Sequence, residues 1–244
     1  MRLYSVAALV LAAVSAPAAA TPGLGDKVYG ATVQKGVSEV EVRYGRLVGD
    51  KADGEDGTVV ELSQGLSDRF YGGVLLEFER KAGERRRLEA VGVEGIIALG
   101  RLKAIDTDVA VYGEYDDVRN GADKVETKLL FQHLKGSFDG RLNLVAEREL
   151  KRGSAIELSY AASADWKLVG DLRGGIEGFG ELGSSRRLFP RAGHFIGPML
   201  KAELEHLPGR GELGIEAGYL FALGAARDAA NGQARLLLEY EFRF

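Results

Sequence analysis

Apolar and charged residues alternate along most of this chain, most clearly in its last nine residues, LLLEYEFRF. Every second position of that stretch is Leu, Tyr or Phe, and the positions between are mostly charged. In an extended strand the two sets lie on opposite faces. The same period recurs through 37–244, and almost no stretch has a helical period. The pattern therefore predicts an all-β protein.

We predict twelve strands, most of 10 to 14 residues. Strands in soluble sheets are usually shorter, about five or six residues, whereas a tilted membrane strand needs ~9–11. An even number suits a single-chain bacterial barrel with both termini on one side. The twelve predicted strands are 37–48, 57–66, 69–80, 87–99, 105–117, 123–135, 140–150, 154–163, 166–180, 193–206, 211–223 and 232–244.

The connections alternate in length, as expected where short periplasmic turns face longer outer loops. Pro198 predicts a bulge or a break in the tenth strand, and the glycines of the ninth predict a bulge there. The predicted short connections are Ser67-Asp68, Gly100–Ala104, Gly136–Asp139, Ala164-Asp165 and Leu207–Arg210; the long ones include Gly49–Asp56, Glu181–Ala192 and Gly224–Asn231.

The start of the chain has the pattern of a secretion signal. Arg2 precedes the apolar run Val6–Val14 and an Ala-rich end, so residues 1–20 are interpreted as a cleaved signal peptide. The run is shorter than the ~20 residues that a spanning helix needs. Residues 21–36 form a lead-in that is either periplasmic or lumenal. In the second case Lys27 and Lys35 would pair with an acidic wall. Residues 37–244 are then the barrel.

The alternation places charged residues repeatedly on one face of the strands. In a bilayer this face must be the interior, because an Arg or Lys facing lipid at mid-depth costs ~2–4 kcal/mol. The fold class is thus a transmembrane antiparallel up-and-down β-barrel. The predicted lumen-lining residues are Glu39, Glu41, Arg43, Glu61, Glu77, Glu79, Glu94, Tyr112, Glu114, Glu126, Lys128, Glu147, Glu157, Asp171, Arg173, Glu177, Lys201, Glu203, Glu216, Glu239 and Glu241.

This interior is acidic on balance, which leaves two interpretations. A water-filled lumen would be a narrow pore for small solutes, and its acidic wall would raise the local concentration of cations. Alternatively, Arg and Lys bridge the carboxylates into a salt-bridged interior without a conduit. In this second interpretation the protein is a non-conducting structural barrel.

Other chemistry has little support in the residues. The chain has no Cys, three His and two Met, without ligand spacing, so we expect neither a metal site nor a cofactor. An outer-membrane hydrolase is the less favoured alternative, with Ser184, Ser185 and His194 near the outer rim and Asp116 or Asp117 as the orienting carboxylate. We do not expect an enzyme. No nucleic-acid motif is present, and the formal charge of −4 disfavours phosphate backbones.

Two features resemble known families. The strand that ends in Tyr240, Phe242 and Phe244 resembles the terminal strand of bacterial outer-membrane barrels, which the barrel-assembly machinery recognises. The turns Ser67–Phe70 and Ser163–Trp166 resemble those of proteobacterial barrels near the phenol-degradation-pathway transporters. The resemblance implies an outer-membrane location, contact with outer-membrane lipid, and passive passage of small solutes, cations among them. The alternative fold is a soluble periplasmic barrel or sandwich.

Overall fold

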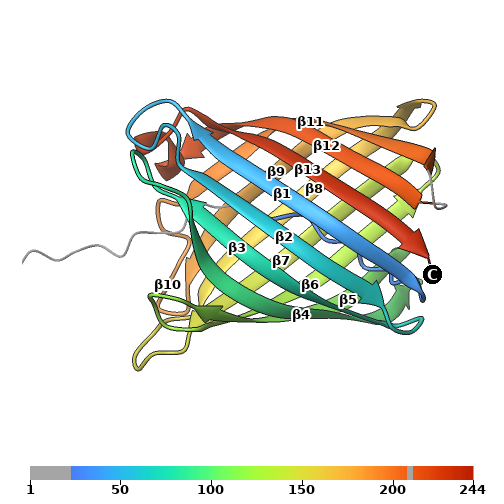
Figure 1. Ribbon diagram of the computed structural model, residues 1–244, viewed down its shortest axis with the longest axis horizontal. Coiled ribbons are helices and arrows are strands. Elements are labelled where there is room, and N and C mark those ends of the chain that lie inside the picture. Colours follow the sequence, from blue (N-terminus) through green and yellow to red (C-terminus); the bar gives the residue numbers. More distant parts are fainter. Residues whose placement is uncertain (1–22, 208–210, 244) are drawn as a thin grey trace, which may run out of the picture.

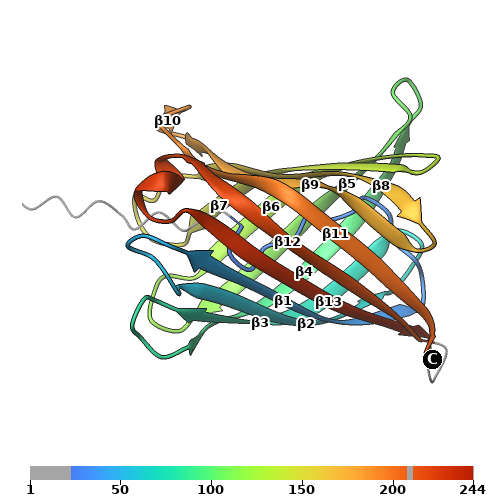
Figure 2. The same ribbon diagram turned by 90° about the horizontal axis from the view of Figure 1, so that it is seen from above.

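The computed structural model describes residues 23–207 and 211–243, in which the strands join into a closed antiparallel barrel (Figures 1 and 2). The predicted signal peptide, residues 1–20, residues 208–210 of the predicted connection Leu207–Arg210, and Phe244 lie outside these ranges. Neighbouring long strands pair in chain order, and β13 pairs with β1 from Val37↔Arg243 to Val48↔Gly232. This ring confirms the transmembrane-type barrel of twelve strands, and the two-layer sandwich alternative is wrong.

Twelve long strands form the wall, and one two-residue strand lies in a loop. No helix in the described part of the chain is long and apolar enough to cross a bilayer. The elements are β1 (Val37–Val48), β2 (Asp56–Gly65), β3 (Phe70–Arg80), β4 (Arg87–Leu102), β5 (Thr107–Val118), β6 (Lys124–Lys135), β7 (Phe138–Glu149), β8 (Glu157–Val169), β9 (Leu172–Ser184), β10 (Arg187–Leu188), β11 (Gly193–Leu207), β12 (Gly211–Gly224), the 3-10 helix η1 (Ala225–Asp228) and β13 (Gly232–Arg243).

The two ends of the barrel differ in their connections. One end, which we call the short-turn end, holds the start of β1, the end of β13 and turns such as 136–137 and 170–171. The other, the long-loop end, holds longer connections such as 49–55 and 150–156. The predicted alternation of short and long connections is therefore confirmed.

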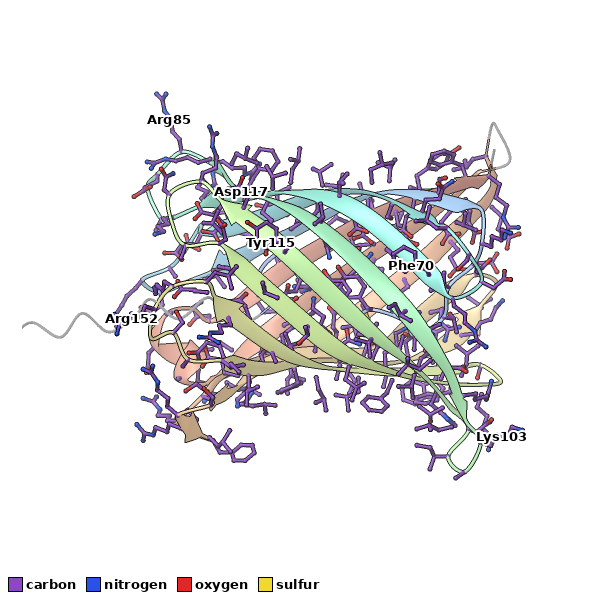
Figure 3. The ribbon with its side chains drawn as sticks, turned by 90° about the horizontal axis from the view of Figure 1, so that it is seen from below. Phe70, Arg85, Lys103, Tyr115, Asp117 and Arg152 are labelled. Carbon is purple, nitrogen blue, oxygen red and sulfur yellow. The ribbon has the colours of Figure 1, made fainter. Side chains whose placement is uncertain are left out.

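Alternate residues of each strand face outward, and these are mainly apolar. Leu62, Val74 and Ile97 on three different strands are each more than half exposed on the outer wall. Figure 3 shows this wall from one side, with Phe70 and Tyr115 near opposite ends of the barrel. The intervening residues point inward and include the charged side chains. A wall that is apolar outside and polar inside fits a lipid surround.

The turn between β8 and β9 lies six residues further along the chain than predicted. We expected it at Ala164-Asp165, but β8 continues to Val169 and the turn falls at Gly170. Gly170 has a φ of 57°, a left-handed conformation that glycine adopts without strain. Asp165 instead remains inside the wall, where it pairs with Arg173.

Irregularities were predicted in β11 and β9. In β11 the structure has a break in the pairing rather than a bulge, because Ile196↔Phe221 and Met199↔Gly218 keep one register while Gly197 and Pro198 have no partner in β12. Pro198 lacks an N–H, and no pairing with β12 is formed at that residue. The glycine-rich β9 does have an irregular register against β8, between Leu158 and Ser159, which confirms the second prediction.

Gly197 in β11 is required by the close approach of β12. A Cβ at this position would collide with the carbonyl oxygen of Tyr219 and lie 2.8 Å from the Cα of Leu220. We expect Gly197→Ala to lower the free energy of unfolding by about 1–3 kcal/mol. Denaturant unfolding of the detergent-folded barrel measures it. Gly113→Ala is the control, since a Cβ there has no neighbour within 4 Å. Equal stability of the two variants would contradict the packing argument.

Candidate functional site: the barrel interior

Residues 23–36 run inside the barrel, and we call them the lumenal segment (Figures 1 and 2). At the short-turn end, the N–H of Gly36 donates to the carbonyl oxygen of Gly65 at 2.8 Å. The segment then passes towards the long-loop end, where Gly23 lies against Phe179 of β9. It therefore traverses much of the interior rather than lying at one rim.

Amide side chains of the wall satisfy the backbone of the lumenal segment. The N–H of Tyr29 donates to Oδ1 of Asn143 at 2.7 Å, and Nδ2 of Asn143 donates to the carbonyl oxygen of Tyr29 at 3.0 Å. The N–H of Ala31 donates to Oε1 of Gln132 at 3.0 Å. Buried backbone groups outside a sheet need such partners. These bonds fix the segment at mid-barrel.

Lys27 of the lumenal segment is held by three carboxylates of the wall. Its Nζ lies 2.9 Å from Glu41, 3.4 Å from Glu39 and 3.7 Å from Glu61. Burial of an ammonium group is costly, and the attraction of Glu41, Glu39 and Glu61 offsets that cost. Lys27 therefore remains an ammonium group, and its predicted pairing with the acidic wall is confirmed. Lys35 forms no such pair within the described ranges.

Tyr29 is the second anchor, and it joins two sides of the barrel. Its hydroxyl donates to Glu94 of β4 at 2.9 Å and accepts from Nη1 of Arg43 at 2.9 Å. The Nζ of Lys128 lies 4.6 Å from the centre of the Tyr29 ring and 4.5 Å from that of Tyr112. Cations over aromatic faces are attracted by the ring quadrupole. Hydrogen bonds and cation–ring contacts therefore both hold Tyr29 in place.

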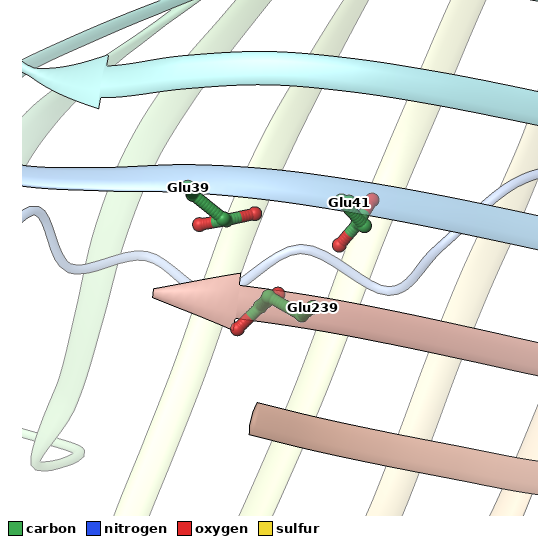
Figure 4. Close-up of side chains that lie close together, drawn as sticks. All are labelled: Glu39, Glu41 and Glu239. Carbon is green, nitrogen blue, oxygen red and sulfur yellow. The ribbon is translucent and has the colours of Figure 1, made fainter. Parts of the chain in front are cut away.

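Carboxylates also gather in two close groups inside the barrel. One ligand oxygen each of Glu39, Glu41 and Glu239 lies within 4.8 Å of the others (Figure 4), and Lys27 supplies the positive charge beside them. A second group consists of Glu77, Glu114 and Asp116. Carboxylates this close are stable only with a cation or a shared proton between them. The interior consequently attracts positive charge.

A cavity of about 330 Å³ lies beside this network, in the half of the barrel near the short turns. Arg141, Arg173 and Lys201 line one part of it, whereas Glu239 and Glu241 line another. The basic groups are already paired with wall carboxylates. Lys201 Nζ lies 3.4 Å from Asp165 and 3.1 Å from Glu216, and Arg141 Nη2 lies 2.8 Å from Asp139. Within the described ranges, Glu241, which lines the acidic part, forms no ion pair.

Towards the long loops, one side of the interior is apolar. Leu24 and Val28 of the lumenal segment pack with Phe179, Phe195 and Leu220, which all point inward. Alanines of the η1 region complete this cluster. Such a cluster excludes water and narrows any path through the barrel. The acidic cavity and the apolar cluster thus occupy different halves of the interior.

Most of the predicted lumen-lining residues are inward-facing in the structure, and those at strand ends are open to solvent. Glu41, Arg43, Glu61, Glu94, Tyr112, Lys128 and Glu177 are buried. Glu39, Glu77, Glu114, Glu126, Glu147, Arg173, Lys201, Glu216, Glu239 and Glu241 are half-buried. Glu79, Glu157, Asp171 and Glu203 are exposed. Asp171 belongs to the β8–β9 turn, next to Lys167 at 3.3 Å, because that turn falls later than predicted.

The Ser and His residues of the hydrolase alternative have other hydrogen-bond partners. His194 faces outward, with Nδ1 3.3 Å from the hydroxyl of Tyr160. The Oγ of Ser185 accepts the N–H of Ile156 at 3.0 Å. Among the described residues, no hydrogen bond joins His194 to Ser184 or Ser185. Nucleophilic catalysis needs such a bond.

Several interior residues were missed at the sequence level. Tyr29, Asn143 and Gln132 fix the lumenal segment, but none of them was among the predicted site residues. Phe179 and Phe195 also point inward, and neither was among the predicted lumen-lining residues. A usable signal existed for Asn143, an amide on the polar face of a strand with apolar outward neighbours.

No protein-family model and no curated protein matches this chain. Solved structures do. The NanC porin aligns over 84% of this chain and 100% of its own, with 12% identity and a TM-score of 0.58. An outer membrane channel from Pseudomonas putida F1 aligns over 87% and 97%, with 14% identity and a TM-score of 0.55. The KdgM porin in complex with disordered oligogalacturonate aligns over 84% and 99%, with 11% identity and a TM-score of 0.52. The structural neighbours are bacterial outer-membrane porins and channels.

Proposed function

We propose that this barrel is an outer-membrane channel for the passive passage of small solutes, that it prefers cations, and that the lumenal segment narrows it. The short turns and both barrel termini would face the periplasm, and the long loops would face outward. Outer-membrane lipid surrounds the apolar wall. The barrel-assembly machinery would read the last strand, in which the rings of Tyr240 and Phe242 stack at 5.8 Å.

One observation carries the cation preference. The chain places its own ammonium group, on Lys27, among Glu39, Glu41 and Glu61. The negative electrostatic potential that holds the ammonium group of Lys27 would also attract dissolved cations. The carboxylates of the cavity, Glu239 and Glu241, extend the same acidic surface towards the short-turn end.

The cargo of the neighbours does not transfer directly. KdgM was solved with oligogalacturonate, which is a polyanion. In this chain the basic residues of the cavity are paired with Asp139, Asp165 and Glu216. Its unpaired charges are acidic, so an anionic oligosaccharide would meet repulsion here. We therefore propose small cations and small neutral solutes as the cargo.

The reversal potential across a planar bilayer under a KCl gradient tests this proposal. We expect a potential on the cation-selective side for the wild-type channel. The double variant Glu239→Gln, Glu241→Gln should lower the K⁺/Cl⁻ permeability ratio by several-fold, because two charges leave the wall of the cavity. The single-channel conductance of each preparation is recorded in the same experiment.

Asp117→Asn is the matched control, because Asp117 lies on the outer side of the wall at the long-loop end (Figure 3). Its removal should leave the permeability ratio unchanged. An anion-selective wild-type channel would overturn the cation preference. A ratio that shifts equally in both variants would show that the cavity carboxylates do not set it.

A non-conducting structural barrel is the second candidate, and the ion-pair network favours it. Arg43, Lys27 and Lys128 neutralise part of the acidic interior, and the apolar cluster lies across the outer half. A folded barrel shifts its band on a gel when it is heated. A heat-shifted band together with silent bilayers would select this candidate over the channel.

A further inference from the structure

A cluster of arginines lies on the outer wall of the barrel at the long-loop end. Arg46 of β1 is opposite Asp56 of β2, which is opposite Arg80 of β3. Arg46, Asp56 and Arg80 each lie on the outward face of their strand, the same face as apolar residues such as Tyr44 and Phe78. The cluster therefore faces away from the lumen and takes no part in the interior network.

Asp56 holds two of these guanidinium groups in place. Its Oδ1 accepts from Nε and Nη2 of Arg86 at 3.0 and 2.9 Å, and its Oδ2 pairs with Nη2 of Arg80. The Asp56 side chain is fully buried, whereas those of Arg80 and Arg86 are 34% and 43% exposed. Buried carboxylates fix the guanidiniums while their outer N–H groups stay free to bind.

The cluster has an excess of positive charge. One carboxylate, that of Asp56, serves Arg80 and Arg86, and Arg46 forms no ion pair with any residue of the described ranges. Arg46 is exposed beside them. Three guanidiniums around one carboxylate leave two positive charges uncompensated. The cluster thus fits an anion that accepts several N–H bonds, as a phosphate group does.

The height of the cluster on the wall indicates where that anion comes from. The next row of outward residues towards the short-turn end consists of Tyr44, Thr58 and Phe78. The guanidinium carbon of Arg86 lies 5.7 Å from the centre of the Tyr44 ring. Aromatic rows mark the boundary between the apolar band and the headgroup layer. The arginines are therefore at the level of lipid headgroups, on an open convex wall.

We propose that Arg46, Arg80 and Arg86 form a binding site for the phosphorylated headgroup of a glycolipid in the outer leaflet. The acyl chains of that lipid lie along the apolar wall, and its phosphate accepts N–H bonds from the guanidiniums. The proposal rests on the outer-membrane location given above, but it does not depend on conduction. It accordingly holds for either an open or a closed barrel.

Lipid retention measured by native mass spectrometry tests the site. The detergent-folded full-length barrel is incubated with diphosphorylated lipid A, with the dephosphorylated lipid, or with inorganic phosphate alone. We expect about tenfold stronger retention of the phosphorylated than of the dephosphorylated lipid. The double variant Arg46→Gln, Arg86→Gln should lose most of this difference. Its heat-shifted gel band verifies that it still folds.

Arg85→Gln is the matched control, because Arg85 belongs to the same loop but projects away from the wall (Figure 3). It should retain the phosphorylated lipid as the wild type does. Equal retention of both lipids by the wild type, or an equal loss in the control, would overturn the proposal. Retention of inorganic phosphate without the lipid would show a phosphate site that is not a lipid site. Failure of the wild type to give a heat-shifted band would instead count against the membrane location itself.

Discussion

A barrel that lacks the lumenal segment is expected to pass several-fold more current than the complete barrel. The segment crosses the interior between an acidic cradle at Lys27 and an apolar cluster around Phe179. Deleting residues 23–35 would take Lys27 out of the cradle and Leu24 and Val28 out of the cluster, and would expose Glu41 and Glu61 to water. A wider, wetter and more acidic pore conducts cations better. Single-channel recording at fixed KCl and voltage measures the change.

A length-matched variant makes the experiment specific. Replacing residues 23–35 by a Gly/Ser sequence of the same length keeps a chain before β1 but removes Lys27 and Tyr29. This chain has no anchor, so we expect a conductance between those of the wild type and the deletion, with frequent current fluctuations. If the deletion conducts like the wild type, the segment does not obstruct the lumen. Where the deletion fails to fold, the double variant Lys27→Gln, Tyr29→Ala provides the same comparison.

The second large effect is expected on stability, for Arg43→Met. Arg43 is 5% exposed and contacts Glu41 at 3.2 Å, Glu61 at 3.0 Å and the hydroxyl of Tyr29 at 2.9 Å. Methionine fills similar space but leaves these carboxylates short of positive charge. Removing one partner of a buried pair costs about 3–5 kcal/mol. We expect the free energy of unfolding to fall by that amount.

Denaturant unfolding in detergent, followed by the loss of the heat-shifted band, measures this change. Arg152→Met is the control, since Arg152 is exposed in the loop after β7 (Figure 3). Adding Glu61→Gln to Arg43→Met should restore part of the stability, because one unpaired charge then disappears. A rescue by Glu61→Gln distinguishes lost charge pairing from lost packing. An Arg43→Met barrel as stable as the control would show that Lys27 alone neutralises the cradle.

Alternation predicted the wall well, because a closed barrel repeats one rule in every strand. Odd or even position along the strand is enough to assign residues such as Glu41 to the lumen and Val40 to the lipid. The twelve strands follow from this alternation and from the turns. The rule fails where both faces carry small residues. In β8 the alternation of Ala161, Ser163 and Asp165 is weak, so the turn was placed too early.

The lumenal segment marks the limit of what the sequence could predict. Its contacts join residues that are far apart in the chain: 114 positions separate Tyr29 from Asn143, and 101 separate Ala31 from Gln132. No local period encodes such pairs. Charge complementarity predicted that Lys27 could meet an acidic wall, but the sequence left open whether the segment enters the lumen. Phe195 has the same parity in its strand as Lys201 and Glu203, but parity does not show that it packs in an apolar cluster with Phe179.

The contacts of Arg235 impose an order on assembly. Arg235 belongs to β13, the last strand, and its guanidinium donates to the carbonyl oxygens of Gly23 and Asp26, over 200 residues earlier in the chain. The first described residues can therefore reach their final partners only when the last strand is in position beside β1. Contacts between such distant residues form late, because the loop-closure entropy must be overcome first. The contacts of Arg235 with the lumenal segment are thus a marker of barrel closure.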